Sequence, residues 1–394
     1  MSRYLSSLAV IGLAVMTLGG PTSAQGDFVA RARALHKQVP LIDGHNDYPW
    51  ALRGLDPGRD FSKAEISKPV PSLMTDIPRL RQGGVGGQFW SVYVPSTMQG
   101  KEAVRATLEQ IDIVHRMTRR WPETFALAAT AADVERAFKS GRIGSLIGME
   151  GGHSIDNSLA TLRMFYALGA RYMTITHSAN LPWADASTDT PALGGLSKFG
   201  EEVIREMNRL GMLVDLSHVS PGTMEDALRV SEAPVIFSHS SAKALCSVPR
   251  NVPDNVLQLT AKNGGVVMVT FVPGFISQAV ADFDAKKPGG TAPTATLAQV
   301  ADHIDHIRKV AGIDHIGLGG DFDGITQVVV GLEDVSKYPD LTAELLRRGY
   351  QDDDIRKILG LNVLRVMKQA EKVAAGLQKT RQPSTATIEQ LDGK

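Results

Sequence analysis

Eight short apolar segments, rich in β-branched residues, recur along the chain with helical patterns between them. This alternation is typical of parallel β–α units and not of a sandwich of short strands. The glycines at 169, 211 and 312 stand where a helix must stop before the next strand. The predicted strands are Val39–Asp43, Gly87–Val94, Gly144–Met149, Tyr172–Thr176, Leu213–Ser217, Val235–Ser238, Val266–Phe271 and Ile316–Gly320.

Eight consecutive units in one chain predict a closed (β/α)8 barrel of the TIM type, an α/β fold. The length of 394 residues suits one such barrel with long loops, although length alone would also allow two or three domains. An open doubly wound sheet is the alternative, but Gly-His-Asn-Asp follows the first strand in place of a glycine-rich nucleotide fingerprint. We expect a helix over Asp352–Lys372 to complete the set and Pro273–Pro293 to form a long loop near the barrel mouth.

The first 24 residues have the pattern of a cleaved secretory signal. Arg3 precedes an apolar run from about Leu8 to Leu18, and small residues follow up to Ala24. The run is shorter than the roughly 20 residues needed to span a bilayer, and no second run follows, so we expect no transmembrane span after signal removal. The predicted organisation is a signal peptide over 1–24, a single barrel domain over 25–376 and a polar, loosely held tail over 377–394. The protein is expected to be secreted or periplasmic.

Composition excludes several classes of protein. The 42 basic side chains balance 42 acidic ones and 43% of residues are hydrophobic, which argues against a disordered chain and against a nucleic-acid partner. The single cysteine, Cys246, excludes an intramolecular disulfide despite the predicted export. We expect this thiol to be a small buried hydrophobic group, and stability to come from the core.

Ionisable side chains follow six of the eight predicted strands. In a barrel the active site lies at the carboxyl ends of the strands, so these side chains should share one rim. They are His45 and Asp47, Glu150, His177, His218, His239 and Asp321. An isolated His-x-Asp pair more often caps a turn. The histidines and the glutamate at the other strand ends favour a functional site instead.

The number of ligands indicates two metal ions. They would be held by His45, Asp47 and Glu150, and by His218, His239 and the second oxygen of Glu150. Imidazole and carboxylate ligands without a thiolate suit zinc, with manganese or cobalt as alternatives. Two such ions would share a nucleophilic hydroxide, and Asp321 would hold its proton and pass it to a leaving amine.

Several linked motifs together resemble the membrane (renal) dipeptidase family. They are Gly-His-Asn-Asp-Tyr-Pro-Trp at 44–50, Glu-Gly-Gly-His-Ser at 150–154, Thr-His-Ser-Ala-Asn at 176–180, Ser-His-Val-Ser at 217–220, Phe-Ser-His-Ser-Ser-Ala at 237–242, Pro-Arg-Asn-Val-Pro-Asp at 249–254 and Gly-Gly-Asp-Phe-Asp-Gly at 319–324. The resemblance covers nearly the whole chain after the signal. It implies a metal-dependent barrel of the amidohydrolase superfamily, in which two zinc ions serve the hydrolysis of dipeptides.

The resemblance also implies roles for individual residues. The first zinc corresponds to His45 and Asp47, the bridging carboxylate to Glu150, and the second zinc to His218 and His239. The family's substrate-binding histidine falls on His177, which would donate to the oxyanion, and its arginine falls on Arg250, which would bind the free carboxylate of a dipeptide. The general base falls on Asp321. Dimers are implied too, whereas the polar C-terminus carries no lipid-anchor signal.

The predicted function is therefore that of an exported dinuclear-zinc dipeptidase using a metal-bridging hydroxide. A related amidohydrolase acting on a β-lactam, a lactone or an N-acyl amino acid is the alternative. A periplasmic binding or metal-storage protein is a rival from another class. Of the remaining residues, His153 either contacts a substrate end or holds its loop, Asp323 supports its neighbours or caps a helix, and His303 and His306 lie on a solvated helix face.

Overall fold

The computed structural model describes residues 22–287 and 289–393, so the predicted signal peptide lies outside the described residues except for 22–24, where α1 begins. The strands are β1 (Leu41–Asn46), β2 (Val85–Ser91), β3 (Phe125–Leu127), β4 (Ile143–Glu150), β5 (Ala170–Thr174), β6 (Leu213–Asp215), β7 (Ile236–Phe237), β8 (Val266–Val269) and β9 (Ile316–Leu318).

The α-helices are α1 (Thr22–His36), α2 (Tyr48–Leu55), α3 (Ile77–Gly83), α4 (Lys101–Arg120), α5 (Ala131–Lys139), α6 (Leu159–Ala167), α7 (Lys198–Leu210), α8 (Pro221–Val230), α9 (Asp254–Asn263), α10 (Pro273–Ile276), α11 (Gln278–Lys286), α12 (Leu297–Val310), α13 (Tyr338–Arg347), α14 (Asp352–Arg356), α15 (Asn362–Thr380) and α16 (Ile388–Asp392). Short 3-10 turns lie at Gly152–Ile155, Ile313–His315 and Val335–Lys337, and a π-helical turn at Lys357–Leu361.

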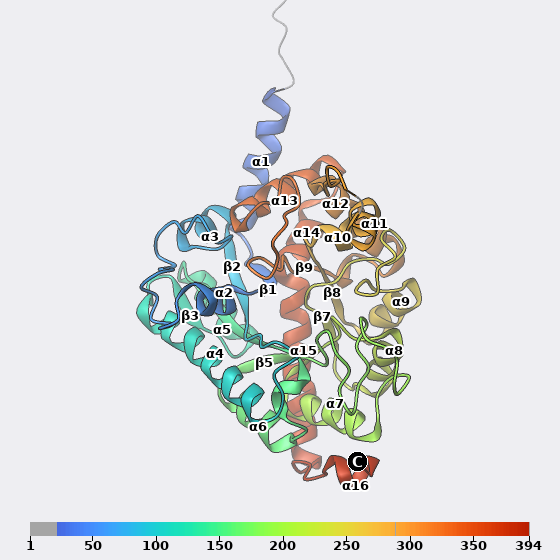
Figure 1. The fold of residues 1–394 in the computed structure, drawn as a ribbon. Coiled ribbons are helices and arrows are strands. Elements are labelled where there is room, and N and C mark those ends of the chain that lie inside the picture. The colour runs from blue at the N-terminus through green and yellow to red at the C-terminus, as the bar shows by residue number, and fades with distance from the viewer. Residues whose placement is uncertain (1–21, 288, 394) are drawn as a thin grey trace, which may run out of the picture.

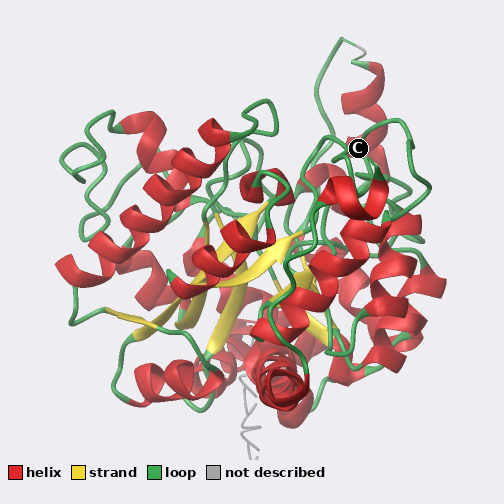
Figure 2. Ribbon diagram, turned by 90° about the horizontal axis from the view of Figure 1, so that it is seen from below, coloured by secondary structure: helices red, strands yellow, loops and turns green. Residues whose placement is uncertain are grey.

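All strand pairings are parallel, and eight strands close into a barrel in the order β1, β2, β4, β5, β6, β7, β8, β9. The predicted (β/α)8 fold is confirmed, with each predicted strand in its place. Figure 2 shows the strands as an inner layer surrounded by helices. The sequence missed β3, which pairs only with the first residues of β4. Three residues of mixed burial are too few to show a period.

The helix that ends the barrel fold covers the amino ends of its strands. Apolar side chains of α15, among them Val363 and Met367, pack in one cluster with Leu213, Ile236 and Val266, which begin or nearly begin their strands. The carboxyl ends are therefore the open ends. The helix predicted over 352–372 is in the right place, but it is divided into α14, the π turn and α15.

The C-terminal segment differs from the expected loose tail. Helix α15 continues past Gly376 to Thr380, and α16 then lies against α7 (Figure 1). The hydroxyl of Ser197 donates to the carboxylate of Asp392 at 2.5 Å, and Arg163 donates to the carbonyl of Ser384 at 2.8 Å. The prediction rested on the polar composition of this segment. A polar segment can nevertheless be held in place by hydrogen bonds to side chains at helix ends and to backbone carbonyls, as it is here.

The segment predicted as a long loop over 273–293 contains the helices α10 and α11. The carbonyl of Ile276 accepts from His303 at 3.0 Å, and the Nδ1 atom of His303 accepts from the backbone of Ala242. His303 is therefore buried, and its prediction on a solvated face was wrong. Cys246 is buried as expected.

Within the described residues, no helix is both long enough and apolar enough to cross a membrane.

Candidate active site

Seven of the eight predicted site residues lie at the carboxyl ends of barrel strands. His45 is in β1 and Glu150 ends β4, while the other five follow their strands within three residues. The backbone continues the β1–β9 pairing beyond the strands, since Asp47 N donates to Phe322 O at 2.9 Å and Asp321 N to His45 O at 3.2 Å. Parallel pairing thus brings residues nearly 280 positions apart to one rim.

Two of these residues have a left-handed backbone. His218 has a φ of 70° and Asp321 a φ of 61°, conformations that cost a non-glycine residue about 1 kcal/mol or more. The turn redirects each side chain at the point where the strand ends. Such strain is typical of functional sites, and sequence patterns do not reveal it.

The carboxylate of Glu150 lies at the centre of the cluster. Its Oε2 atom is 3.4 Å from Nε2 of His45, whose Nε2 is in turn 3.3 Å from Oδ2 of Asp47. Its Oε1 atom lies 3.0 Å from Nε2 of His218 and 3.4 Å from Nε2 of His239. The two oxygens of this carboxylate therefore face two different groups of side chains.

The surrounding imidazoles favour the negatively charged form of this carboxylate. Burial alone would raise the pKa of Glu150, but the nearby imidazoles of His45 and His177 and the hydrogen bond from His218 hold it well below the usual range. Burial likewise opposes charge on His45, yet Tyr172, Glu150 and Asp47 raise its pKa well above the ordinary value. The two carboxylates thus stabilise positive charge at this position, whether on the imidazole or on a bound cation.

The donor set fits divalent metal ions. Two buried atoms, Nε2 of His45 and Oδ1 of Asp47, have no hydrogen-bond partner within the described residues. Leaving such groups unpaired is costly, and a cation bound by them would offset this cost. Nitrogen and oxygen donors without a thiolate suit zinc. The groups close enough to hold an ion are His45, Glu150 and His239; Glu150, His177 and His218; and His45, Asp47 and Asp321.

Arg250 is the one predicted site residue that does not follow a strand. It lies in the segment between β7 and α9, with 5% of its surface exposed. Its guanidinium stacks over the ring of Phe275 at 5.1 Å, and its buried Nη1 atom has no hydrogen-bond partner in the described part of the chain. Burial lowers its pKa to about 10, despite the attraction of Asp321 and Glu150. Among the described residues it forms no salt bridge, and its Nη2 atom lies 3.5 Å from the carbonyl oxygen of His239.

A cavity of about 390 Å³ opens onto these residues. Aromatic and aliphatic side chains that the sequence reading did not select complete its lining: Trp50, Tyr93, Val272, Phe275 and Ile325. Trp50 and Tyr93 meet edge to face at 5.1 Å, and Tyr93 lies 5.0 Å from the ring of His177. Position was the available signal, because Tyr93 lies two residues after β2 and Trp50 lies in the first turn of α2, the helix that follows β1.

Asp321 lies at the rim of this cavity among other carboxylates. Burial, with the negative charges of Asp47 and Glu150, raises the pKa of Asp321 well above the usual range, although His45 and Arg250 oppose the shift. Asp323 also lines the cavity and accepts from the backbone of Met74 at 2.6 Å. Asp323 therefore holds a neighbouring loop, as expected of a supporting residue.

His153 lies in the turn after β4. It is buried, its Nε2 atom lies 3.1 Å from the carbonyl of Val94, and burial lowers its pKa to about 4. It is absent from the cavity lining. These contacts favour the second sequence expectation, in which His153 holds its loop.

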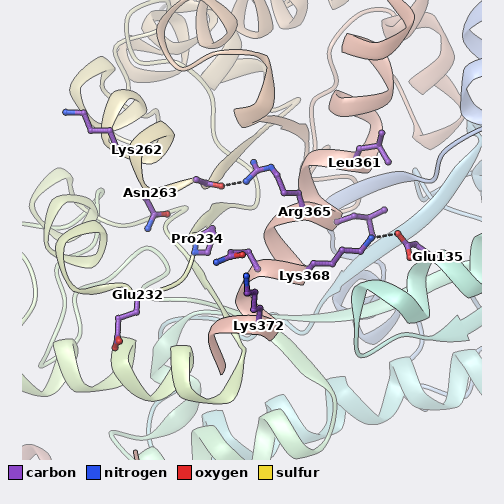
Figure 3. Close-up of a pocket in the computed structure, with 12 residues that line it drawn as sticks. Glu135, Glu232, Pro234, Lys262, Asn263, Leu361, Arg365, Lys368 and Lys372 are labelled. Atoms are coloured by element: carbon purple, nitrogen blue, oxygen red, sulfur yellow. Dashed lines mark hydrogen bonds and ion pairs between the residues drawn. The ribbon is translucent and has the colours of Figure 1, made fainter. Parts of the chain in front are cut away.

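A second, larger cavity of about 660 Å³ lies at the amino end of the barrel beside α15. Figure 3 shows that Lys368 pairs there with Glu135 and that Arg365 bonds to the main chain, at the carbonyl of Gly264. None of the predicted site residues lines it. Size alone therefore does not mark the active site.

Comparison with known proteins agrees with this geometry. The profile of the family described as membrane dipeptidase (peptidase family M19) matches residues 29–381. The dipeptidase verJ of Clonostachys rogersoniana is 45% identical over 365 residues, which cover 90% of each chain.

Two solved structures resemble the whole barrel. The probable dipeptidase PvdM from Pseudomonas aeruginosa has a TM-score of 0.79 at 26% identity, covering 89% of this chain and all of that one. A metallopeptidase from Rhodobacter sphaeroides, liganded with a phosphinate mimic of the dipeptide L-Ala-D-Ala, has a TM-score of 0.75 at 26% identity, covering 84% of this chain and 99% of that one.

Proposed function

Because this chain belongs to the membrane dipeptidase family, peptidase family M19, we propose that it hydrolyses the amide bond of dipeptides using two zinc ions. The observation that carries the substrate class is the buried Arg250, whose Nη1 atom has no hydrogen-bond partner among residues 22–287 and 289–393. A guanidinium in such a cavity complements a carboxylate, and a dipeptide carries one at its C-terminus.

The proposed ligands of the two ions lie on either side of Glu150. His45 and Asp47 would hold one ion with Oε2 of Glu150, and His218 and His239 the other with Oε1. When bound, two zinc ions would polarise the scissile carbonyl and supply an activated water near neutral pH, the bridging hydroxide expected from the sequence.

The remaining residues would bind substrate and move protons. Arg250 would hold the terminal carboxylate and so place the amide beside Glu150. His177 would donate a hydrogen bond to the carbonyl oxygen as negative charge develops there. Asp321 would take a proton from the attacking water on its carboxylate and deliver it to the leaving amine. The aromatic rings of Trp50 and Tyr93 would exclude water from the substrate's side chains.

A cavity of about 390 Å³ supports a small substrate. The structure from Rhodobacter sphaeroides binds a mimic of L-Ala-D-Ala, so we propose that a D-residue is accepted at the second position here too. The test is a dipeptide panel with L- and D-residues at that position, together with a β-lactam, a lactone and an N-acyl amino acid, run on zinc-loaded protein.

The substrate panel distinguishes a dipeptidase from the alternative amidohydrolase. Turnover of free dipeptides supports the proposal, whereas turnover confined to the other substrates favours the alternative amidohydrolase. Metal analysis is the second arm. Much less than two ions per chain, with no amide hydrolysis after zinc addition, would favour a binding or storage protein.

Export and dimerisation belong to the same proposal. The basic, apolar and small-residue order of the first 24 positions supports a cleaved signal. N-terminal sequencing of the protein recovered outside the cytoplasm should begin near Gln25, and an uncleaved Met1 would contradict it. Sedimentation of the purified protein tests the expected homodimer.

A further inference from the structure

A chain of hydrogen bonds runs behind His239, on the side away from Glu150. The hydroxyl of Ser238 donates to Oδ2 of Asp215 at 2.6 Å, and the same hydroxyl lies 2.8 Å from Nδ1 of His239. All three residues are buried, with at most 1% of their surface exposed. The chain joins a carboxylate in β6 to the imidazole that follows β7.

The direction of each bond follows from Asp215. Its Oδ1 atom accepts from the backbone N–H groups of Ser217 and Ser238, and its Oδ2 atom accepts from the hydroxyls of Thr174 and Ser238. A carboxylate surrounded by donors only accepts. The single proton of the Ser238 hydroxyl is therefore directed at Asp215, and the hydroxyl oxygen must accept from His239.

This direction determines the tautomer of His239. Its Nδ1 atom carries the hydrogen, so its Nε2 atom keeps the lone pair. This Nε2 atom lies 2.9 Å from Nε2 of His218 and 3.4 Å from Oε1 of Glu150, between the two proposed ligands. By contrast, the Nδ1 atom of His218 has no partner. Histidine ligands of metals depend on such partners for their orientation and basicity.

We propose that Asp215, acting through the hydroxyl of Ser238, is a positioning residue that holds His239 in the tautomer needed to bind a metal ion. This inference rests on the proposed function, because it takes His239 to be a zinc ligand. It adds two residues to the site, neither of which lines the cavity.

The first test is Ser238→Ala. This change removes the hydroxyl but keeps the backbone bond from residue 238 to Asp215 at 2.8 Å and the bond from His239 N to the Ser217 hydroxyl at 3.0 Å. Loss of a supporting partner typically weakens metal binding about 10- to 100-fold. The zinc Kd, measured by competition with a chromophoric chelator after metal removal, should rise by that factor at one of two sites.

Ser241→Ala is the matched control. Ser241 is buried in the same segment, and its hydroxyl has no partner within the described residues. Its zinc Kd should stay within about twofold of the original.

Asp215→Asn gives the sharper test. The two N–H groups at Oδ1 require an oxygen there, so the new amide nitrogen must face the hydroxyls of Thr174 and Ser238. It would donate to Ser238, whose proton would turn toward Nδ1 of His239 and impose the wrong tautomer. Zinc binding should weaken more than in Ser238→Ala.

The double variant then distinguishes a relay from two separate structural effects. Adding Ser238→Ala to Asp215→Asn removes the hydroxyl that imposes the wrong tautomer, so zinc binding should recover to the level of Ser238→Ala alone. Losses that multiply, or a Ser238→Ala protein with unchanged zinc Kd, would overturn the inference. The proposed function fails separately, if the unmodified protein binds no zinc or hydrolyses no dipeptide.

Discussion

Arg250 is a buried cation with no carboxylate partner among the described residues, although its Nη2 atom lies 3.5 Å from the carbonyl oxygen of His239. Its stacking on Phe275 orients the guanidinium, and Arg250 lines the same cavity as Glu150 and Asp321. A charge-assisted hydrogen bond contributes about 1.5–3 kcal/mol. Substrate recognition should therefore depend strongly on this side chain.

Arg250→Ala should raise the KM for free dipeptides about 10- to 100-fold, because the carboxylate loses its counter-charge. Steady-state kinetics with matched free and C-terminally amidated dipeptides provide the measurement, and the amidated substrates should be nearly indifferent to the change. Arg365→Ala, at the amino end of the barrel, is the control. Equal losses on both substrates would show that Arg250 does not bind the carboxylate.

Glu150 and Asp321 should separate metal binding from proton transfer. Glu150→Ala removes the carboxylate that faces both ligand sets, so bound zinc and turnover should fall together. Asp321→Asn keeps an oxygen donor but loses the proton acceptor, so zinc should remain while kcat falls by at least about 100-fold. The measurements are metal content by mass spectrometry and kcat. Retained zinc in Glu150→Ala together with lost zinc in Asp321→Asn would contradict the assigned roles.

At the scale of the elements, the side chain of Tyr172 in β5 packs directly against Gly148 in β4. A Cβ atom on Gly148 would lie 2.0 Å from Cζ of Tyr172, so only glycine leaves room for this ring. The Tyr172 hydroxyl reaches Nδ1 of His45 at 2.8 Å, inside the barrel. Close packing between two neighbouring strands thus supports a predicted ligand on a third.

Gly148→Ala should destabilise the protein by about 1–3 kcal/mol, because the interior must accommodate an overpacked methyl group. Urea unfolding provides the measurement, and Tyr172→Leu in the same chain should recover part of the loss. Gly54→Ala is the matched control, since no other atom lies within 4 Å of its added Cβ. Unchanged stability in Gly148→Ala would refute the steric argument.

At the scale of the whole molecule, buried neutral histidines join separate parts of the barrel. His36 of α1 lies between the carbonyl of Gly83 at 3.1 Å and the hydroxyl of Thr342 at 2.9 Å. His303 of α12 bonds to Ala242 and Ile276. Burial lowers the pKa of each imidazole from 6.5 to about 4.

Stability should fall as the solution becomes acidic. Because the folded pKa lies below the unfolded value, the stabilisation is complete above pH 6.5 and is lost as the pH falls toward 4. Each histidine should contribute on the order of 2–3 kcal/mol to this loss. Urea unfolding of metal-free protein at pH 7.5 and 4.5 measures it. His36→Gln and His303→Gln should each flatten the pH dependence, and an unchanged slope would contradict this account.

The sequence by itself determined the order of the barrel strands and the ionisable residues at their carboxyl ends. Both follow from local patterns, since apolar periodicity marks a strand and a polar residue directly after it marks the rim. The linked motifs added a predicted role for Arg250 and the resemblance to the membrane dipeptidase family, whose profile matches the chain. The same local reading missed β3, α10 and α11, and it placed His303 on the surface.

Only the tertiary structure decided which atoms face one another. The two oxygens of Glu150 face two different groups of side chains because strands from opposite ends of the chain close into one barrel. The left-handed turns at His218 and Asp321, and the bonds from Asp215 through Ser238 to His239, depend on contacts between strands. Local sequence patterns cannot predict such contacts, because the direction of each hydrogen bond depends on neighbours that are distant along the chain.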